Sequence, residues 1–120
     1  MIKQLTIIAA ILFLYLLFTS TVHAKENNGL NIIKDELRAQ GLNQSEVEVM
    51  YAIMLCESNG DPYAQNPNNS AAGLWQITKS TFEANSDYDW ELRYDWLVSL
   101  ETAVKIYKSR GTQPWSQCVK

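Results

Sequence analysis

Histidine is nearly absent from this chain of 120 residues, since His23 is the only one. His23 lies in an N-terminal segment that we expect to be removed, which leaves the mature domain without histidine. This absence excludes Ser-His and Cys-His nucleophile systems and histidine-based zinc sites. We therefore expect no metal site and no cofactor, and carboxylate chemistry is the route to catalysis that remains.

Basic side chains are few and scattered. One of the 10 Lys and Arg residues is Lys3, so residues 25–120 carry 9 basic and 13 acidic side chains, for a net charge of −4. The basic residues form no stripe along the sequence, which argues against a nucleic-acid partner. The composition suggests nothing beyond one small domain, and we expect a monomer.

The N-terminal 24 residues have the pattern of a secretory signal peptide. Lys3 is followed by an apolar run over residues 5–18, shorter than a membrane span, and then by the small-residue motif Val22-x-Ala24. We expect cleavage after Ala24 and a secreted, periplasmic or cell-wall location, with only transient contact with the membrane. The alternative is an uncleaved anchor helix.

Cysteine occurs only twice, as Cys56 and Cys118. Export favours a disulfide between them, because oxidising compartments preserve such bonds. Closing a loop of about 62 residues stabilises a fold by roughly 4 kcal/mol on the chain-entropy model. The bond would also hold the C-terminal tail beside Glu57. The alternative is two free thiols in a reducing compartment.

No segment alternates with the period of two that strands require, so we expect a mainly α fold. Residues 25–44 would form an N-terminal segment with one short helix, and residues 45–120 a compact domain with an irregular loop over residues 61–72. The expected helices span residues 32–40 (capped by Asn31, ended by Gly41), 46–58 (capping box of Ser45 and Glu48), 79–84 (capped by Thr78 or Ser80) and 96–109 (capped by Asp95). The last helix should bury a stripe of Leu97, Leu100 and Val104, with Trp96, Ala103 and Tyr107 alongside.

Glu57 ends the apolar stripe of the second expected helix, whose members are Met50, Ile53 and Met54. Partial burial and a place in the last helical turn, where the helix dipole disfavours negative charge, should both raise the pKa of this carboxyl group. A carboxyl group that keeps its proton near neutral pH can serve as a general acid. The alternative is an ordinary solvated glutamate at the surface.

Two separated motifs resemble those of soluble lytic transglycosylases and goose-type lysozymes. They are Glu57-Ser58 and, after Asn66, the segment from Ser70 to Thr78, which contains Gly73-Leu74-Trp75-Gln76. The cysteine before the glutamate and the closing Gly111-x-x-Pro114-Trp115-x-x-Cys118 are similar to the compact, resuscitation-promoting-factor-like branch of the lysozyme superfamily.

The resemblance implies a lysozyme-like domain that cleaves the β-1,4 bond between N-acetylmuramic acid and N-acetylglucosamine in peptidoglycan. Glu57 would protonate the leaving oxygen and then deprotonate the 6-hydroxyl group, which closes a 1,6-anhydro ring. Residues that the resemblance or their aromatic character assigns to the substrate are Gln76, Asn66, Ser70, Trp75, Tyr107 and Trp115. The alternatives are loop-folding roles for Asn66, Ser70 and Gln76 and core packing for the aromatic residues.

Two other functions stay open from the sequence. A lysozyme-type hydrolase of the same bond would use a second carboxylate, for which the candidates are Asp61, Asp87, Asp89 and Asp95. Asp61 is also placed to form a turn with Pro62, and Asp95 to cap a helix. A non-catalytic protein that keeps the fold to bind glycan or to serve in assembly is the third possibility.

Overall fold

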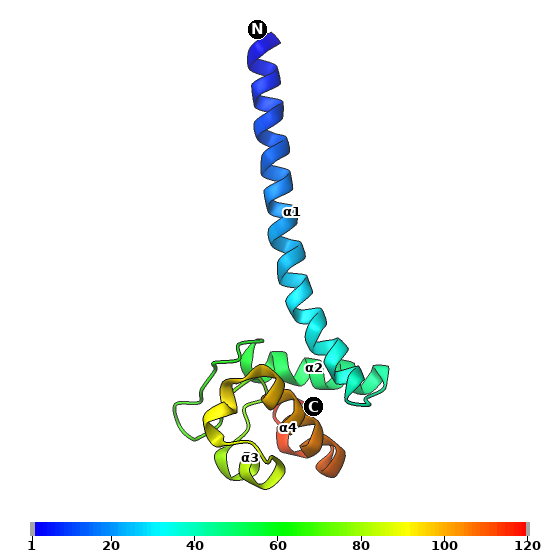
Figure 1. The fold of residues 1–120 in the computed structure, drawn as a ribbon, viewed down its shortest axis with the longest axis vertical. Helices are drawn as coiled ribbons and strands as arrows, with labels where there is room; N and C mark the ends of the chain where they lie inside the picture. Colours follow the sequence, from blue (N-terminus) through cyan, green and yellow to red (C-terminus); the bar gives the residue numbers. More distant parts are fainter. Residues whose placement is uncertain (1, 120) are drawn as a thin grey trace. The chain divides into compact units, whose positions relative to one another are not determined.

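The structure is a computed structural model that describes the backbone of residues 2–119 and the side chains of residues 6–17, 29 and 31–119. The chain forms two compact units, Met1–Ile32 and Ile33–Lys120. The first helix, α1 (Ile2–Ala39), begins in the first unit and ends in the second (Figure 1). None of the helices in the part of the chain that was described is long and apolar enough to cross a membrane.

The prediction of a short helix capped by Asn31 is wrong, because this segment belongs to the long helix α1. Asn31 lies inside a continuous helix that extends to Ala39, because residues 25–31 contain no proline to interrupt it. Ile33 and Leu37, in its last turns, are buried. Gly41 follows the helix with a φ of +94°, as a glycine at a helix end does. The predicted cleavage site at Ala24 lies outside the described side chains, so it stays a prediction.

Helix α2 (Gln44–Ser58) begins two residues earlier than its expected cap would place it. Asn43, not Ser45, is the N-cap: its Oδ1 accepts the Glu46 N–H at 3.0 Å, and Glu46 Oε1 accepts the Asn43 N–H at 3.1 Å. The Ser45 hydroxyl donates to Asn43 Oδ1 instead. Asparagine caps a helix at least as well as serine, so the first competent residue in the chain takes this position.

Helices α3 (Lys79–Asn85) and α4 (Trp96–Arg110) agree with the sequence expectations. Asp95 caps α4 by accepting the N–H groups of Leu97 and Val98. Of the predicted stripe, Leu100, Ala103 and Val104 are buried, whereas Trp96 is 38% exposed. The buried residues of α4 are Val98, Ser99, Leu100, Thr102, Ala103, Val104 and Ile106. Two 3₁₀-helices, η1 (Trp90–Tyr94) and η2 (Gln113–Trp115), were not predicted.

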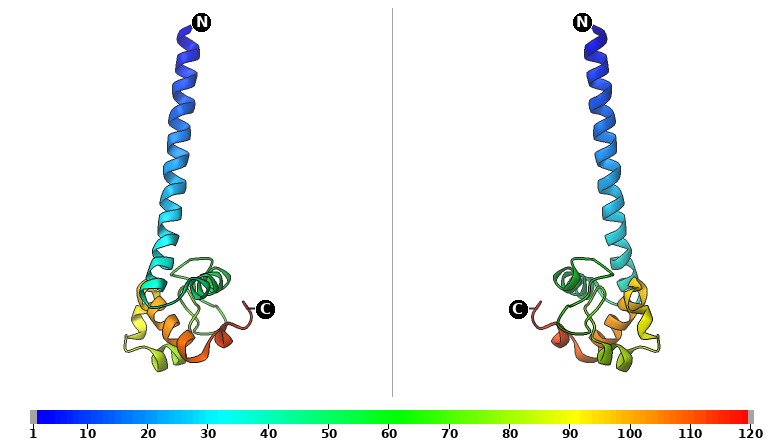
Figure 2. Two further views of the ribbon diagram at one scale, coloured as in Figure 1. Left: turned by 90° about the vertical axis from the view of Figure 1, so that its right-hand side faces the viewer. Right: turned by 90° about the vertical axis from the view of Figure 1, so that its left-hand side faces the viewer.

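Within the unit Ile33–Lys120, the helices enclose one hydrophobic core in which Trp75 is fully buried. Among residues 2–119 no strand forms, and the loop after α2 is ordered by isolated bridges from Gln65 to Ala72 and from Ala72 to Ile77. The mainly α fold with an irregular loop is therefore confirmed. The C-terminal segment lies beside the end of α2, as the two views of Figure 2 show.

Candidate active site

Glu57 lies in the last turn of α2, where Asn59 in the left-handed region (φ 54°) and Gly60 (φ 77°) turn the chain away from the helix. Its side chain is only partly buried, whereas Ser58 behind it is buried and donates its hydroxyl to Met54 O. Burial raises the pKa of the Glu57 carboxyl group above its usual value. The expected direction of the pKa shift is thus confirmed.

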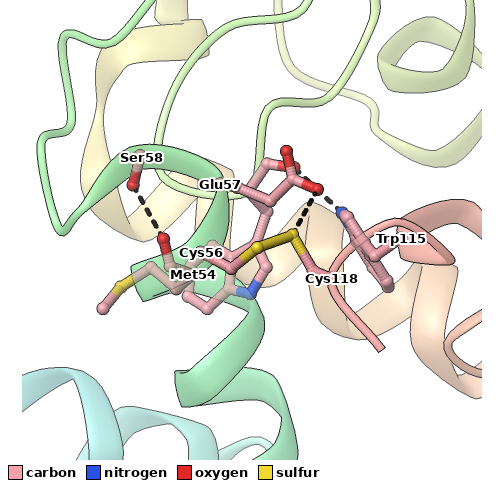
Figure 3. Close-up of a disulfide and its surroundings, with 7 residues drawn as sticks. Met54, Cys56, Glu57, Ser58, Trp115 and Cys118 are labelled. Atoms are coloured by element: carbon pink, nitrogen blue, oxygen red, sulfur yellow. Dashed lines mark hydrogen bonds between the residues drawn. A yellow bond between two sulfur atoms is a disulfide. The ribbon is translucent and has the colours of Figure 1, made fainter. Parts of the chain in front are cut away.

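The disulfide between Cys56 and Cys118 is present, with a Cα–Cα distance of 5.9 Å. Cys118 Sγ lies 3.2 Å from Glu57 Oε1, and Figure 3 shows the carboxyl group directly above the sulfur pair. A disulfide sulfur has no proton to donate and is at most a weak acceptor. A hydrogen bond across this contact therefore requires the carboxyl O–H as its donor, and the contact gives no stabilisation to the carboxylate form.

Two indole hydrogen bonds anchor the tail on which Cys118 lies. Trp115 Nε1 donates to Trp75 O at 2.9 Å, and Trp75 Nε1 donates to Met50 O at 3.0 Å. The Cys118 N–H in turn donates to Trp115 O at 2.9 Å. The tail is thus connected through Trp75 to the middle of α2, in addition to its covalent bond to the end of that helix.

Gln76 has a fixed and strained conformation. Its backbone has a φ of +51°, in the left-handed region that a non-glycine residue enters at a cost of about 1–2 kcal/mol. Its Nε2 donates two hydrogen bonds of 3.0 Å, to Ala64 O and Gly73 O. Both amide protons are therefore committed to the backbone, and Oε1 is the atom that remains to accept a hydrogen bond. Strain of this kind is often found at functional sites.

Beside Gln76 lies an open hollow of about 200 Å³. Its walls come from the segment that leads into α3, from the end of α4 and from η2: Gln76, Ile77, Thr78, Thr81, Ile106, Arg110, Pro114 and Trp115. Glu57 is not one of its walls. Trp115 connects the two places, because it lines the hollow while its backbone carbonyl accepts the N–H of Cys118, whose sulfur lies next to the Glu57 carboxyl group.

Asn66 and Ser70 order the loop between α2 and α3. Asn66 Oδ1 accepts the Asn68 N–H at 2.8 Å, and Asn66 N–H donates to Ala71 O. Ser70 Oγ accepts the Lys79 N–H at 2.9 Å and so supplies the cap that Thr78 does not give to α3. The loop-folding alternative accounts for these contacts, while the Ser70 hydroxyl proton and the Asn66 amide nitrogen remain available to a ligand.

The aromatic residues differ in their placement. Trp75 is 0% exposed and presents no ring face to a sugar, so the core-packing alternative describes it. Trp115 is 4% exposed and contributes to the wall of the hollow rather than to an open platform. Tyr107 lies on α4 and contacts Glu46 at the start of α2; burial and this contact raise its pKa. Glu46 is eleven residues before Glu57, about 16 Å along the axis of α2. Tyr107 is not brought together with Glu57.

Three of the four candidate second carboxylates are bound to the backbone. Asp61 accepts the Tyr63 N–H, Asp89 accepts the Glu91 N–H, and Asp95 caps α4. Asp87 is exposed. In the part of the chain that the structure describes, no group of acidic, histidine or cysteine side chains is arranged to hold a metal ion.

Sequence reasoning missed Arg110, Thr81 and Pro114 as neighbours of Gln76, and no local pattern identifies them. The family model for the transglycosylase SLT domain matches residues 32–115, a range that contains Glu57, Gln76 and Trp115. No curated protein and no solved structure matches the chain. The range matched by the family model therefore includes these three residues of the candidate site.

Proposed function

Because the chain belongs to the transglycosylase SLT domain family, whose members act on peptidoglycan, we propose that it is a lytic transglycosylase with Glu57 as its general acid and base. The observation that carries this proposal is the Glu57 carboxyl group, which is partly buried, has a raised pKa and contacts a disulfide sulfur. These surroundings favour the protonated form that the first step of glycosidic cleavage needs.

In the first step the Glu57 O–H gives its proton to the oxygen between C1 of N-acetylmuramic acid and C4 of N-acetylglucosamine. The C1–O bond breaks and positive charge develops on the muramic acid ring. The Glu57 carboxylate then takes the proton of the 6-hydroxyl group, and the new O6–C1 bond closes a 1,6-anhydro ring. Glu57 ends the cycle protonated, and no water is consumed.

Gln76 is proposed to hold the substrate in place. Its Nε2 bonds to Ala64 O and Gly73 O direct the amide group, so Oε1 is presented in one orientation. An N-acetyl N–H or a sugar hydroxyl group is the kind of donor that this oxygen accepts. Asn66 and Ser70 remain proposed substrate contacts through their free donors, and Trp115 through the wall of the hollow.

Hydrolysis of the same bond is the second candidate. An inverting hydrolase needs a second carboxylate to activate water, and the carboxylates of Asp61, Asp89 and Asp95 are already hydrogen-bonded to backbone N–H groups. This observation favours the transglycosylase route, in which Glu57 performs both proton transfers. A non-catalytic glycan-binding role would use a fixed Gln76 but would not require a protonated Glu57.

The test is digestion of purified cell walls followed by mass spectrometry of the released muropeptides. A transglycosylase gives anhydro ends that are lighter by one water than the reducing ends made by a hydrolase. We expect Glu57→Gln to abolish release, while Glu83→Gln, which alters an exposed carboxylate on α3, serves as the matched control. Full activity of Glu57→Gln would refute the assignment, and reducing ends would identify a hydrolase.

Export remains part of the proposal. We propose that residues 1–24 direct the protein out of the cytoplasm and are removed, and that the mature protein is a monomer. The intact mass of the protein recovered from outside the cytoplasm tests export and cleavage directly. A chain beginning at Lys25 supports cleavage after Ala24, and the mass of the uncleaved chain indicates an anchor.

A further inference from the structure

We propose that the hollow beside Gln76 is a subsite for a free carboxylate of the peptide carried by muramic acid, with Arg110 as its specificity-determining residue. The inference rests on the proposed function, because it takes peptidoglycan as the substrate. It concerns a part of the site that does not include the reacting bond.

Arg110 is the one charged residue among the walls of the hollow. Its contact with Gln113 Oε1 is long, at 3.5 Å, and it takes part in none of the ion pairs formed by the described residues. Its guanidinium group is therefore not neutralised by an acidic partner. A planar guanidinium forms two parallel hydrogen bonds with a carboxylate, which is the anion that it fits best along with phosphate.

The other polar walls complement the same ligand. The Thr78 hydroxyl donates to Thr81 Oγ1 at 3.0 Å, which leaves the Thr81 hydroxyl proton free to donate into the hollow. Gln76 Oε1 offers an acceptor on the side of the loop. A group that joins a carboxylate to an amide N–H can thus bond to Arg110 and Thr81 at one end and to Gln76 at the other.

The size and the apolar walls limit what can enter. At about 200 Å³ the hollow is smaller than the roughly 300–1,000 Å³ of pockets that enclose drug-sized ligands. It suits a group about the size of one amino acid, and Ile77, Ile106 and Pro114 provide surface for its methylene groups. Muramic acid carries such amino acids on its lactyl group, and they include free carboxylates joined to amide N–H groups.

The link to Glu57 explains why this ligand would matter. Trp115 lines the hollow, and its carbonyl accepts the N–H of Cys118, whose sulfur contacts the Glu57 carboxyl group. A peptide carboxylate bound at Arg110, at the end of α4, would therefore lie beside the tail segment that contacts the general acid. We expect the enzyme to prefer glycan strands that carry peptides with free carboxylates over peptide-free strands.

The test uses the full chain and a small probe with no cleavable glycosidic bond. Muramyl-alanyl-glutamate with free carboxylates is titrated against its diamide, with tryptophan fluorescence or calorimetry as the readout. We expect the free acid to bind at least tenfold more tightly, and Arg110→Gln to remove this difference while Arg110→Lys keeps part of it. Lys105→Gln, an exposed cation on the same helix, is the control and should keep the full difference.

Equal binding of acid and diamide to the unaltered chain would overturn the proposal, as would a full preference in Arg110→Gln with circular dichroism showing an intact fold. A second assay compares kcat/KM on peptide-bearing strands with kcat/KM on strands stripped of peptide. We expect this ratio to fall about tenfold in Arg110→Gln, and an unchanged ratio contradicts the proposal. Failure of the unaltered chain to cleave either strand would refute the proposed function, while the binding assay would still decide the subsite.

Discussion

The double variant Cys56→Ser/Cys118→Ser removes the covalent bond between the end of α2 and the C-terminal tail. The two residues are 62 positions apart, and the chain-entropy model gives about 4 kcal/mol for a loop of that length at 25 °C. Domains of this size are stable by about 5–15 kcal/mol. The variant should therefore lose a large part of its free energy of unfolding and still fold, because the Trp115–Trp75 hydrogen bond remains.

Urea titration followed by far-UV circular dichroism measures this loss. With a slope of about 1–1.5 kcal/mol per molar urea, a loss of about 4 kcal/mol should lower the transition midpoint by about 3–4 M. The matched variant is Trp115→Phe, which keeps the disulfide and leaves the Trp75 carbonyl without its indole donor, at a cost of about 1–3 kcal/mol. If the double cysteine variant costs less than Trp115→Phe, then the indole and not the disulfide holds the tail, and the reasoning is refuted.

The same double variant has a second measurable consequence at the site. Without the disulfide the Glu57 carboxyl group loses its sulfur neighbour and gains water, so its pKa should move back toward the ordinary value of a glutamate. The alkaline limb of the pH–activity profile should then shift to lower pH. An unchanged limb together with a large loss of stability would separate the structural role of the disulfide from any role in catalysis.

Three further predictions concern single residues. Burial raises the Glu57 pKa in the folded state, so its contribution to stability is fully present below the unfolded-state pKa and is lost as pH rises through the folded-state value. Glu57→Gln should therefore flatten the decline in unfolding free energy that sets in as pH rises above the ordinary glutamate pKa of 4.5, measured by urea titration; a decline of the same size in both proteins contradicts this. Gly73→Ala should lower the unfolding free energy by about 2–3 kcal/mol, because Gly73 has a φ of +80° and a Cβ there would lie 2.7 Å from Arg93 O. Thermal denaturation measures this loss of stability, and an unchanged stability would show that the turn can relax. Ser99→Ala should raise stability by about 1 kcal/mol, because the buried Ser99 hydroxyl has no hydrogen-bond partner among the described residues; a loss of stability would mean that this hydroxyl is bonded in solution.

Local signals made several parts of the fold predictable from the sequence. Asp95 as the cap of α4, Gly41 after α1 and the short helix after Thr78 each depend on side chains within a few residues of the feature they set. The cysteine pair was predictable because the chain has two cysteines, which leave one pairing, and because export was expected. Glu57 stood out for the same reason, since the stripe before it and the helix end both lie in one short segment.

The parts that escaped prediction depend on contacts between distant positions. Trp75 donates to a carbonyl 25 positions earlier, and Trp115 donates to one 40 positions earlier. Contacts over such separations do not affect hydrophobic periodicity or helix capping, so the sequence could not distinguish core packing from sugar stacking for Trp75 or Trp115. Arg110 and Gln76 line the same hollow because of the way the end of α4 packs near the loop, which the sequence of α4 alone does not specify.

Competition between equivalent residues explains the remaining local error. Asn43 and Ser45 both meet the requirements of an N-cap, and Glu46 and Glu48 each lie three residues after one of them. The sequence therefore contains two overlapping capping boxes. The structure uses the first, and the Ser45 hydroxyl then supports it by donating to Asn43 Oδ1.

The two bonds from Gln76 Nε2 to backbone carbonyls have a thermodynamic consequence for recognition. A free glutamine side chain loses up to about 2 kcal/mol of rotamer entropy when a ligand immobilises it. In this protein that ordering takes place when the domain folds, together with the left-handed backbone at the same residue. A ligand that reaches Gln76 Oε1 therefore meets a rigid acceptor, and the entropic cost of its rigidity falls on the folding equilibrium and not on binding.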